Sequence, residues 1–451
     1  MSKILLFLQF SHSMIWHILR YWITFFIPAY YRRIQAKNLH FLKAPGPVII
    51  AMNHPNAFTD PILLTYLAYP QRLKFLARGD AFKPGIISRL LESIGIIPIF
   101  RIQDAGREGL LKNDESYRRV NHFLKHNGKI IVFAEGLCVQ ERRLRPLKKG
   151  VARMVYGAYE ALNDERLAVV PVCVNYGQPD RFRSNAFYNI GAPIPVKELM
   201  PAYRLNPAKA NKDFLNLLSQ EMKKLLTHIN DPANDAIVMR VEEMRKHHLL
   251  AQRGLDPNNL EHDFRILTEI TEKVNNAAVQ SPGILHEFKS LSETYFSELK
   301  KEKLSDEVLD PERNAYGSFF LLILRLIVII AGLPFYLAGL CGNYLPFRVT
   351  IAVTKKIVKD VEFFSSFALG VAMIVFFLNY LVIFLVLYFL SGSSLMPVTG
   401  CVLLGLCGGF NVFYQPFLVK TMQLARFVIF RRRLQHLTGL RERLVALINK
   451  F

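Results

Sequence analysis

A histidine and an aspartate in one short segment, His54 and Asp60, are the residues whose types and spacing best suit acid–base chemistry. They lie in segment 53–61, directly after the apolar run 48–52. An imidazole removes a proton from an alcohol well when its neutral tautomer is fixed and the imidazolium that forms is stabilised. A carboxylate can do both. The pair therefore predicts a general base, and the alternative is a polar turn whose histidine only hydrogen-bonds the backbone.

The elements that would position this pair can be predicted from the neighbouring residues. The run 48–52 predicts a buried strand, and His54 follows in a turn, where side chains can reach a substrate. Thr59 or Asp60 followed by Pro61 predicts an N-cap with proline at the first helical position. The segment therefore indicates a strand, a turn that carries the histidine, and a helix.

Three later segments add polar groups at the ends of strand-length apolar runs. Segment 95–101 ends in Arg101, which can form two parallel hydrogen bonds with a phosphate or can be an ordinary surface cation. Segment 132–138 follows a helix that is predicted over about 115–126 and ends at Asn127-Gly128, and it places Glu135 and Gly136 at the mouth of a strand. Segment 169–172 is a further strand.

A cluster of cations follows Glu135 and Gly136. It comprises Arg142, Arg143, Arg145, Lys148 and Lys149. Such a cluster can bind the phosphate of an acceptor, the phosphates of coenzyme A or anionic lipid, and a solvated basic loop is the alternative.

Taken in order, His54 with Asp60 and the three later segments resemble the four signature blocks of the glycerolipid acyltransferases, the glycerol-3-phosphate and 1-acylglycerol-3-phosphate acyltransferase superfamily. Five residues separate His54 from Asp60, where most of the family has four, and this spacing is similar to the glycerol-3-phosphate and dihydroxyacetone-phosphate acyltransferase branch. Ala134, Leu137 and Cys138 depart from the usual third block, which puts a phosphate contact from Cys138 in doubt.

The resemblance implies an O-acyltransferase of phospholipid biosynthesis that moves a fatty acyl group from a thioester to the hydroxyl of glycerol-3-phosphate. His54 would be the base and Asp60 its partner, while Asn53, Arg101, Glu135 and Gly136 would bind the acceptor. Acyl-CoA or acyl-carrier protein would be a co-substrate, with no metal and no other cofactor. The alternatives are acylation of lysophosphatidic acid or another lysolipid, and a non-catalytic membrane scaffold with the same fold.

Composition fits an enzyme that works on a membrane. The 451 residues are 51% hydrophobic and carry a formal net charge of +21, which favours anionic lipid surfaces as partners. Nucleic acid is not expected, since no reading motif accompanies the charge. His122 and His126 have metal-ligand spacing but lack a third ligand, so a polar helix face is the interpretation. The five cysteines are scattered and predict no disulfide framework.

The chain divides by composition into five segments. We predict an interfacial anchor over 1–36, an α/β catalytic domain with a mixed sheet and flanking helices over 37–196, and a charged helical extension over 197–315. Transmembrane or re-entrant segments follow over 316–419, and a basic amphipathic tail over 420–451.

Charge predicts the topology of an integral membrane protein. Segments 317–341, 366–390 and 395–419 are each long enough to span, and the basic stretches before the second and after the third predict cytoplasmic ends. Acyl thioesters are expected on that side. We therefore expect Pro334 to break the first segment into a re-entrant hairpin, which keeps the catalytic domain on the cytoplasmic face.

Overall fold

The structure is a computed structural model that describes residues 24, 26–79, 85, 88, 91, 92, 95–100, 102–311 and 319–451. The predicted anchor over 1–36 therefore lies mostly outside the described residues. The chain forms two compact units. The first comprises the chain up to His228 with Asn258–Phe264 and Asp360–Ser366, and the second comprises Ile229–Pro257, Arg265–Lys359 and Phe367–Phe451.

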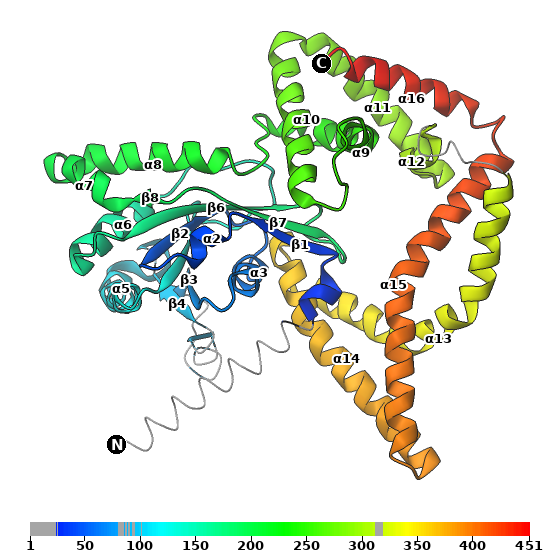
Figure 1. The fold of residues 1–451 in the computed structure, drawn as a ribbon, viewed down its shortest axis with the longest axis horizontal. Coiled ribbons are helices and arrows are strands. Elements are labelled where there is room, and N and C mark those ends of the chain that lie inside the picture. The colour runs from blue at the N-terminus through cyan, green and yellow to red at the C-terminus, as the bar shows by residue number, and fades with distance from the viewer. Residues whose placement is uncertain are drawn as a thin grey trace. The chain divides into compact units, whose positions relative to one another are not determined.

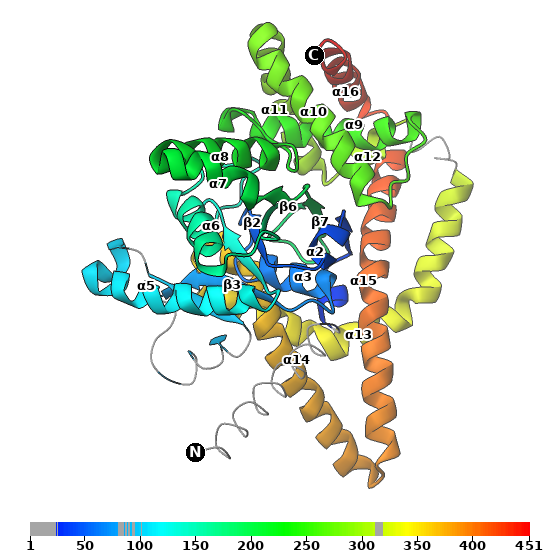
Figure 2. The same ribbon diagram turned by 60° about the vertical axis from the view of Figure 1, so that its left-hand side comes forward.

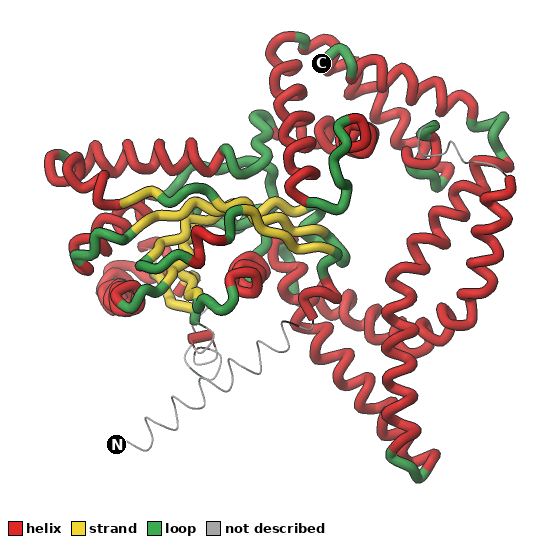
Figure 3. The backbone as a smooth tube through the Cα atoms, viewed as in Figure 1, coloured by secondary structure: helices red, strands yellow, loops and turns green. Residues whose placement is uncertain are grey.

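An eight-stranded mixed sheet is the centre of the first unit (Figure 3). Its strands follow the order β1-β7-β6-β2-β5-β3-β4, and β8 pairs with β6. The strand bounds are β1 Arg33–Lys37, β2 Val48–Met52, β3 Leu73–Arg78, β4 Ile96–Ile99, β5 Lys129–Phe133, β6 Ala168–Tyr176, β7 Asn185–Ile190 and β8 Ile194–Pro195. Strands β2 to β6 run parallel to their neighbours among themselves, while β7 and β8 run antiparallel to β6.

Strand β2 lies in the middle of this sheet and is buried along its whole length. It pairs in parallel with β5 and with β6, so Met52 lies beside Phe133 on one side and beside Val172 on the other. Parallel strands bring their carboxyl ends to the same edge of a sheet. Residues that follow β2, β5 and β4 are therefore gathered at one edge.

Helices cover both faces of the sheet (Figures 1 and 2). On one face, side chains of β2, β5 and β6 share a core with α5 (Ile102–Lys125), α6 (Lys149–Leu162), α7 (Val196–Leu205) and α8 (Pro207–Lys223). Helix α3 (Thr59–Ala68) follows β2 and buries Leu63 and Leu64. The predicted fold class, a mixed sheet with flanking helices, is confirmed.

Two local predictions need correction. The N-cap of α3 is Phe58, which makes no side-chain cap, so neither Thr59 nor Asp60 caps the helix and both lie inside its first turn. Helix α5 begins at Ile102, well before the expected start near Glu115, and it ends as predicted ahead of Asn127, whose φ is +57°. Asp60 is used elsewhere, as described below.

The second unit is helical, with α9 (Asp235–Gln252), α11 (Pro282–Glu302), α12 (Asp306–Leu309) and α16 (Gln435–Ile448) around one apolar core. Helix α10 (Leu260–Gln280) contributes most of its length to the same core. The residues predicted as one helical extension over 197–315 thus belong to two different units, because the apolar faces of α7 and α8 are buried against the sheet of the first unit. A buried arginine of α16, Arg441, pairs with Asp306 and Asp310.

Among the described residues three helices are long and apolar enough to cross a membrane, as predicted. They are α13 (Phe319–Ile357), α14 (Val361–Ser391) and α15 (Leu395–Ile429). Pro334 does not produce the expected hairpin, because α13 is one continuous, bent helix with Pro334 and Pro346 inside it (Figure 1). Tyr414 of α15 donates a hydrogen bond to the Ile329 carbonyl in the turn before Pro334, and such partners let a membrane helix retain a proline.

Candidate active site

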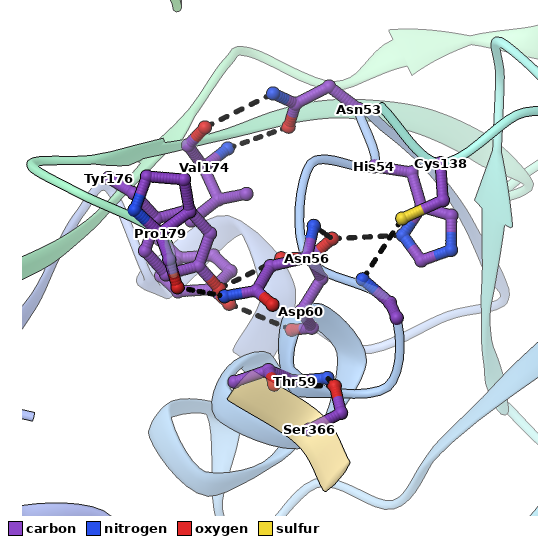
Figure 4. Close-up of polar contacts among 12 residues, drawn as sticks. Asn53, His54, Asn56, Thr59, Asp60, Cys138, Val174, Tyr176, Pro179 and Ser366 are labelled. Atoms are coloured by element: carbon purple, nitrogen blue, oxygen red, sulfur yellow. Dashed lines mark hydrogen bonds and ion pairs between the residues drawn. The ribbon is translucent and has the colours of Figure 1, made fainter. Parts of the chain in front are cut away.

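The side chain of Asn53 continues the hydrogen-bond ladder beyond the end of β2. Its Nδ2 donates to the Val174 carbonyl at 3.1 Å, and its Oδ1 accepts from the Val174 backbone N–H at 2.8 Å (Figure 4). This double contact ties the start of the turn to β6. In the structure Asn53 therefore fixes the position of His54, and its predicted contact with the acceptor stays a prediction.

The turn after His54 is held by contacts on several sides. The Asn56 side chain is fully buried and donates to the Pro179 carbonyl at 2.9 Å, while its backbone carbonyl accepts from the Thr59 N–H at 3.0 Å. Ala57 has a φ of +32°, which is unfavourable for a residue with a Cβ, and its N–H donates to the Cys138 Sγ at 3.1 Å. A strained turn of this kind persists only where its surroundings determine it.

His54 and Asp60 meet as the sequence predicts. The distance from His54 Nδ1 to Asp60 Oδ2 is 2.9 Å. The Asp60 side chain is completely buried, and its oxygens accept from two further donors: Oδ2 from the Asn56 N–H at 2.9 Å and Oδ1 from the Tyr176 hydroxyl at 2.8 Å. An ionised carboxylate only accepts, so Nδ1 of a neutral His54 carries the proton and Nε2 is the basic nitrogen.

The imidazole of His54 is fixed by stacking as well. It lies parallel to the ring of Phe133, the last residue of β5, with centroids 3.6 Å apart and planes 14° apart. The His54 side chain is 16% exposed, in contrast to Asp60. An oriented imidazole with one edge accessible and a buried carboxylate behind it is the arrangement of a general base.

Two buried tyrosines surround the aspartate. The Tyr188 hydroxyl donates to the Asp60 backbone carbonyl at 2.8 Å, while Tyr176 reaches the carboxylate itself. Burial, with the Asp60 charge adding to it, raises the pKa of both phenols well above the ordinary value. Both hydroxyls therefore remain donors at physiological pH.

Glu135 lies at the mouth of β5, at the same edge as His54. Its Oε2 accepts from the Arg145 backbone N–H at 2.9 Å. Burial raises the pKa of Glu135 to about 7, even though the backbone N–H groups of Arg145 and His54 act in the opposite direction. Glu135 thus carries its proton for part of the time near neutral pH. Gly136 follows with a φ of +66°, a conformation that favours glycine.

The cations after Glu135 are placed in different surroundings. Glu141 accepts two hydrogen bonds from the guanidinium of Arg145, at 3.0 and 2.7 Å, and also lies 3.5 Å from Arg143. Arg142 donates to the Gly177 carbonyl at 3.4 Å. Lys148 and Lys149 are exposed. The cluster is therefore partly neutralised, and its two lysines face solvent at the start of α6.

Arg101, the predicted phosphate contact, lies outside the described residues. Its neighbour Phe100 is anchored at the end of β4: the Asn113 side chain accepts from the Phe100 N–H at 2.8 Å and donates to its carbonyl at 2.7 Å. The role of Arg101 stays a prediction.

Part of the chain matches a known protein family. The acyltransferase family model matches residues 33–175, which include β1 to β5 and all of β6 except Tyr176. These residues form an acyltransferase domain. The resemblance predicted from the four blocks is confirmed.

Curated relatives of the acyltransferase domain come from yeast. Glycerol-3-phosphate O-acyltransferase 1 of Saccharomyces cerevisiae is 36% identical over 139 residues, which is 30% of this chain and 18% of the relative. Glycerol-3-phosphate O-acyltransferase 2 of the same yeast is 27% identical over 222 residues, 48% of this chain and 29% of the relative. The chain thus spans less than a third of the length of either protein.

The solved structures that match include the 1-acyl-sn-glycerophosphate acyltransferase of Thermotoga maritima, which is 14% identical with a TM-score of 0.33 over 48% of this chain and 82% of its own.

Several residues that shape the acyltransferase site were not found from the sequence. Tyr176 and Tyr188 hold Asp60, Phe133 stacks on His54, and Cys138 supports the turn at Ala57. Cys138 stands at a position where the third block departs from the family pattern, and this departure is a sequence signal that could have identified it as a site residue. The tyrosines gave none, because their proximity to Asp60 depends on the pairing of β6 with β2 for Tyr176 and with β7 for Tyr188.

Proposed function

We propose that this chain is a membrane acyltransferase that transfers a fatty acyl group from an acyl thioester to the hydroxyl of glycerol-3-phosphate. The observation that carries the proposal is the contact of His54 Nδ1 with a buried carboxylate that two other donors hold in place. This geometry fixes the tautomer that a base needs. The yeast relatives named above support glycerol-3-phosphate as the acceptor.

In the proposed reaction His54 Nε2 takes the proton of the acceptor hydroxyl as its oxygen attacks the thioester carbonyl carbon. Asp60 stabilises the imidazolium that forms, and Tyr176 and Asn56 keep the carboxylate oriented. The C–S bond then breaks, and the imidazolium returns its proton to the leaving thiolate. The products are the ester and the free thiol, and the step requires no metal or redox cofactor.

The acceptor would bind at the same edge of the sheet. Glu135 and Gly136 lie at the mouth of β5, two residues beyond Phe133, which stacks on His54. We assign Arg101 and the exposed Lys148 and Lys149 to the phosphate of the acceptor or of coenzyme A, since cations with several N–H donors recognise phosphate.

A membrane location follows from the substrates and from the sequence. In the part of the chain that the structure describes, three helices have the length and apolarity of membrane spans. Acyl chains and their glycerolipid products reside in the bilayer, so a site on the same chain shortens the path between enzyme and lipid. The cytoplasmic face remains our expectation, because the thioester donors are found there.

The test compares the full-length wild type with His54→Ala in detergent, with labelled acyl-CoA and glycerol-3-phosphate. We expect kcat to fall by at least about 10²-fold in the variant, because a general base contributes on the order of 10² to 10⁴. His126→Ala is the matched control, since that histidine is exposed in the turn after α5 and its ring bonds the His122 carbonyl, away from the His54 site.

Two results would contradict the proposal. Equal turnover in wild type and His54→Ala would show that another group is the base. Turnover in neither, with a carrier-protein donor and lysophosphatidic acid also supplied, would support a membrane scaffold that keeps the fold without the reaction. Turnover with lysophosphatidic acid alone would keep the reaction class and change the acceptor.

A further inference from the structure

The start of helix α14, Asp360–Ser366 with the residue that precedes the helix included, belongs to the same compact unit as the turn that leads from His54 to Asp60, called here the catalytic turn. Helix α14 has the length and composition of a membrane span, and its start lies about 300 residues beyond His54 in the sequence. We infer that Asp360–Ser366, called here the α14 clamp, is a positioning element of the active site. The inference rests on the proposed function for its catalytic consequence.

Ser366 contacts the turn that connects His54 to Asp60. The Thr59 backbone N–H lies 3.1 Å from Ser366 Oγ, and the two hydroxyls are 2.8 Å apart (Figure 4). Thr59 is the first residue of α3, and the N-cap of that helix supplies no side-chain acceptor. The first N–H groups of a helix need acceptors from outside it. Ser366 shares this N–H with the Asn56 carbonyl and therefore acts as a cap from a distant part of the chain.

Ser365 is linked to the catalytic turn through the loop that follows β6. Its hydroxyl is buried and donates to the Pro179 carbonyl at 2.6 Å. The same carbonyl accepts from the Asn56 side chain, so Ser365 and Asn56 are joined by one acceptor in the loop that follows β6. The hydrogen bonds of the α14 clamp thus reach the catalytic turn directly and through this loop.

A third loop is held at the same place. Gln140, in the loop between Glu135 and the basic cluster, donates to the Val361 carbonyl at 3.2 Å. The rings of Phe58 and Phe363 pack edge to face with centroids 6.4 Å apart. Loops that follow β2, β5 and β6 therefore all contact the α14 clamp. These loops carry the base, the buried glutamate and the acceptor for Asn56.

The catalytic turn has a physical need for such support. Ala57 lies in a left-handed conformation that is unfavourable for a residue with a Cβ. Asp60 can meet His54 only while this turn is kept. Contacts from Cys138, Pro179 and Ser366 hold its successive residues, and two of these three depend on segments outside the four sequence blocks.

The experiment uses the full-length protein in detergent with three variants. Ser366→Ala removes the cap, Ser366→Thr keeps a hydroxyl, and Ser394→Ala changes an exposed serine that makes no side-chain cap at the start of α15. Hydrogen–deuterium exchange of peptides that cover residues 56–68 reports on the catalytic turn. The kcat and KM for acyl transfer report on whether catalysis depends on the geometry of this turn.

We expect Ser366→Ala to speed exchange of these peptides and to lower kcat by about five- to tenfold with little change in KM. A fold-change of this size corresponds to the free energy that one helix cap contributes. Ser366→Thr should have the exchange rate and the kcat of the wild type, and Ser394→Ala should match the wild type as well. Unchanged exchange in Ser366→Ala would overturn the inference. Faster exchange with unchanged kcat would overturn the positioning role.

A second variant covers the case in which Ser366→Ala does not fold. Thr59→Val removes one hydroxyl of the pair and keeps the Thr59 N–H and the side-chain shape. It should lower kcat in the same direction by a smaller factor, and no effect on exchange or kcat would contradict the inference. If the wild type itself transfers no acyl group, the proposed function fails, while the exchange measurements still decide whether the clamp holds the turn.

Discussion

Tyr176→Phe tests whether the buried carboxylate of Asp60 depends on its third donor. The substitution removes the hydroxyl that donates to Asp60 Oδ1 at 2.8 Å and leaves the ring in place. Asp60 is completely buried, so a partner removed from Oδ1 is not readily replaced by bulk solvent. A hydrogen bond to a charged group contributes roughly 1.5 to 3 kcal/mol to stability. We therefore expect the free energy of unfolding to fall by about that amount.

The matched control for this prediction is Tyr188→Phe. Its hydroxyl is as buried and makes a bond of the same length, but the acceptor is the neutral backbone carbonyl of Asp60. A neutral hydrogen bond contributes only about 0.5 to 1.5 kcal/mol. In thermal unfolding in detergent the wild type should therefore be the most stable, Tyr188→Phe less stable and Tyr176→Phe the least stable.

Catalysis should separate the two variants further. With Tyr176→Phe one oxygen of Asp60 is no longer fixed, so the orientation of His54 rests on Oδ2 alone, and kcat should fall by about tenfold, or 1.4 kcal/mol of activation free energy. Tyr188→Phe should change kcat by less than about twofold. If Tyr176→Phe is no less stable than Tyr188→Phe and turns over as fast, the reasoning about the charged carboxylate is wrong.

Two further predictions concern buried charges. Burial holds the pKa of Glu135 at about 7, so over the range from about pH 4.5 to about 7 the folded state keeps a proton that the unfolded chain has lost. The free energy of unfolding should therefore fall as the pH rises through that range, by up to about 3 kcal/mol, and Glu135→Gln should flatten this dependence in thermal unfolding. A slope equal to that of the wild type would show that Glu135 is not the group responsible. Arg441→Met leaves Asp306 buried without its cation and should lower stability by roughly 3 to 5 kcal/mol, whereas Lys420→Met, at an exposed pair, should cost less than about 1 kcal/mol.

The sequence predicts the elements of the catalytic unit well because apolar runs and polar strand ends are local features. Buried strands appear where β2, β4, β5 and β6 were expected, and His54 and Asp60 are in contact. The parallel pairing of these strands explains why blocks that are far apart in the sequence meet at one edge.

Side-chain partners across elements could not be predicted in this way. Tyr188 reaches Asp60 because β7 pairs with β6 in a register that places it opposite Val174, and no local pattern shows that register. The prediction of a hairpin at Pro334 was wrong for a related reason. A proline predicts a break from local sterics, but hydrogen bonds between α13 and α15 also determine whether the helix continues.

These contacts separate the groups that would do the chemistry from the groups that orient them. His54, Asp60 and Glu135 all lie within residues 33–175, which match the acyltransferase family. Tyr176, which holds the Asp60 carboxylate, lies just beyond that range, and Ser366 lies far beyond it. Since kcat depends on orientation as well as on the base, the same four blocks joined to a different continuation of the chain should keep the residue types of the site and lose part of its geometry. The membrane helix α14 is thus expected to affect the rate of acyl transfer and not only the location of the enzyme.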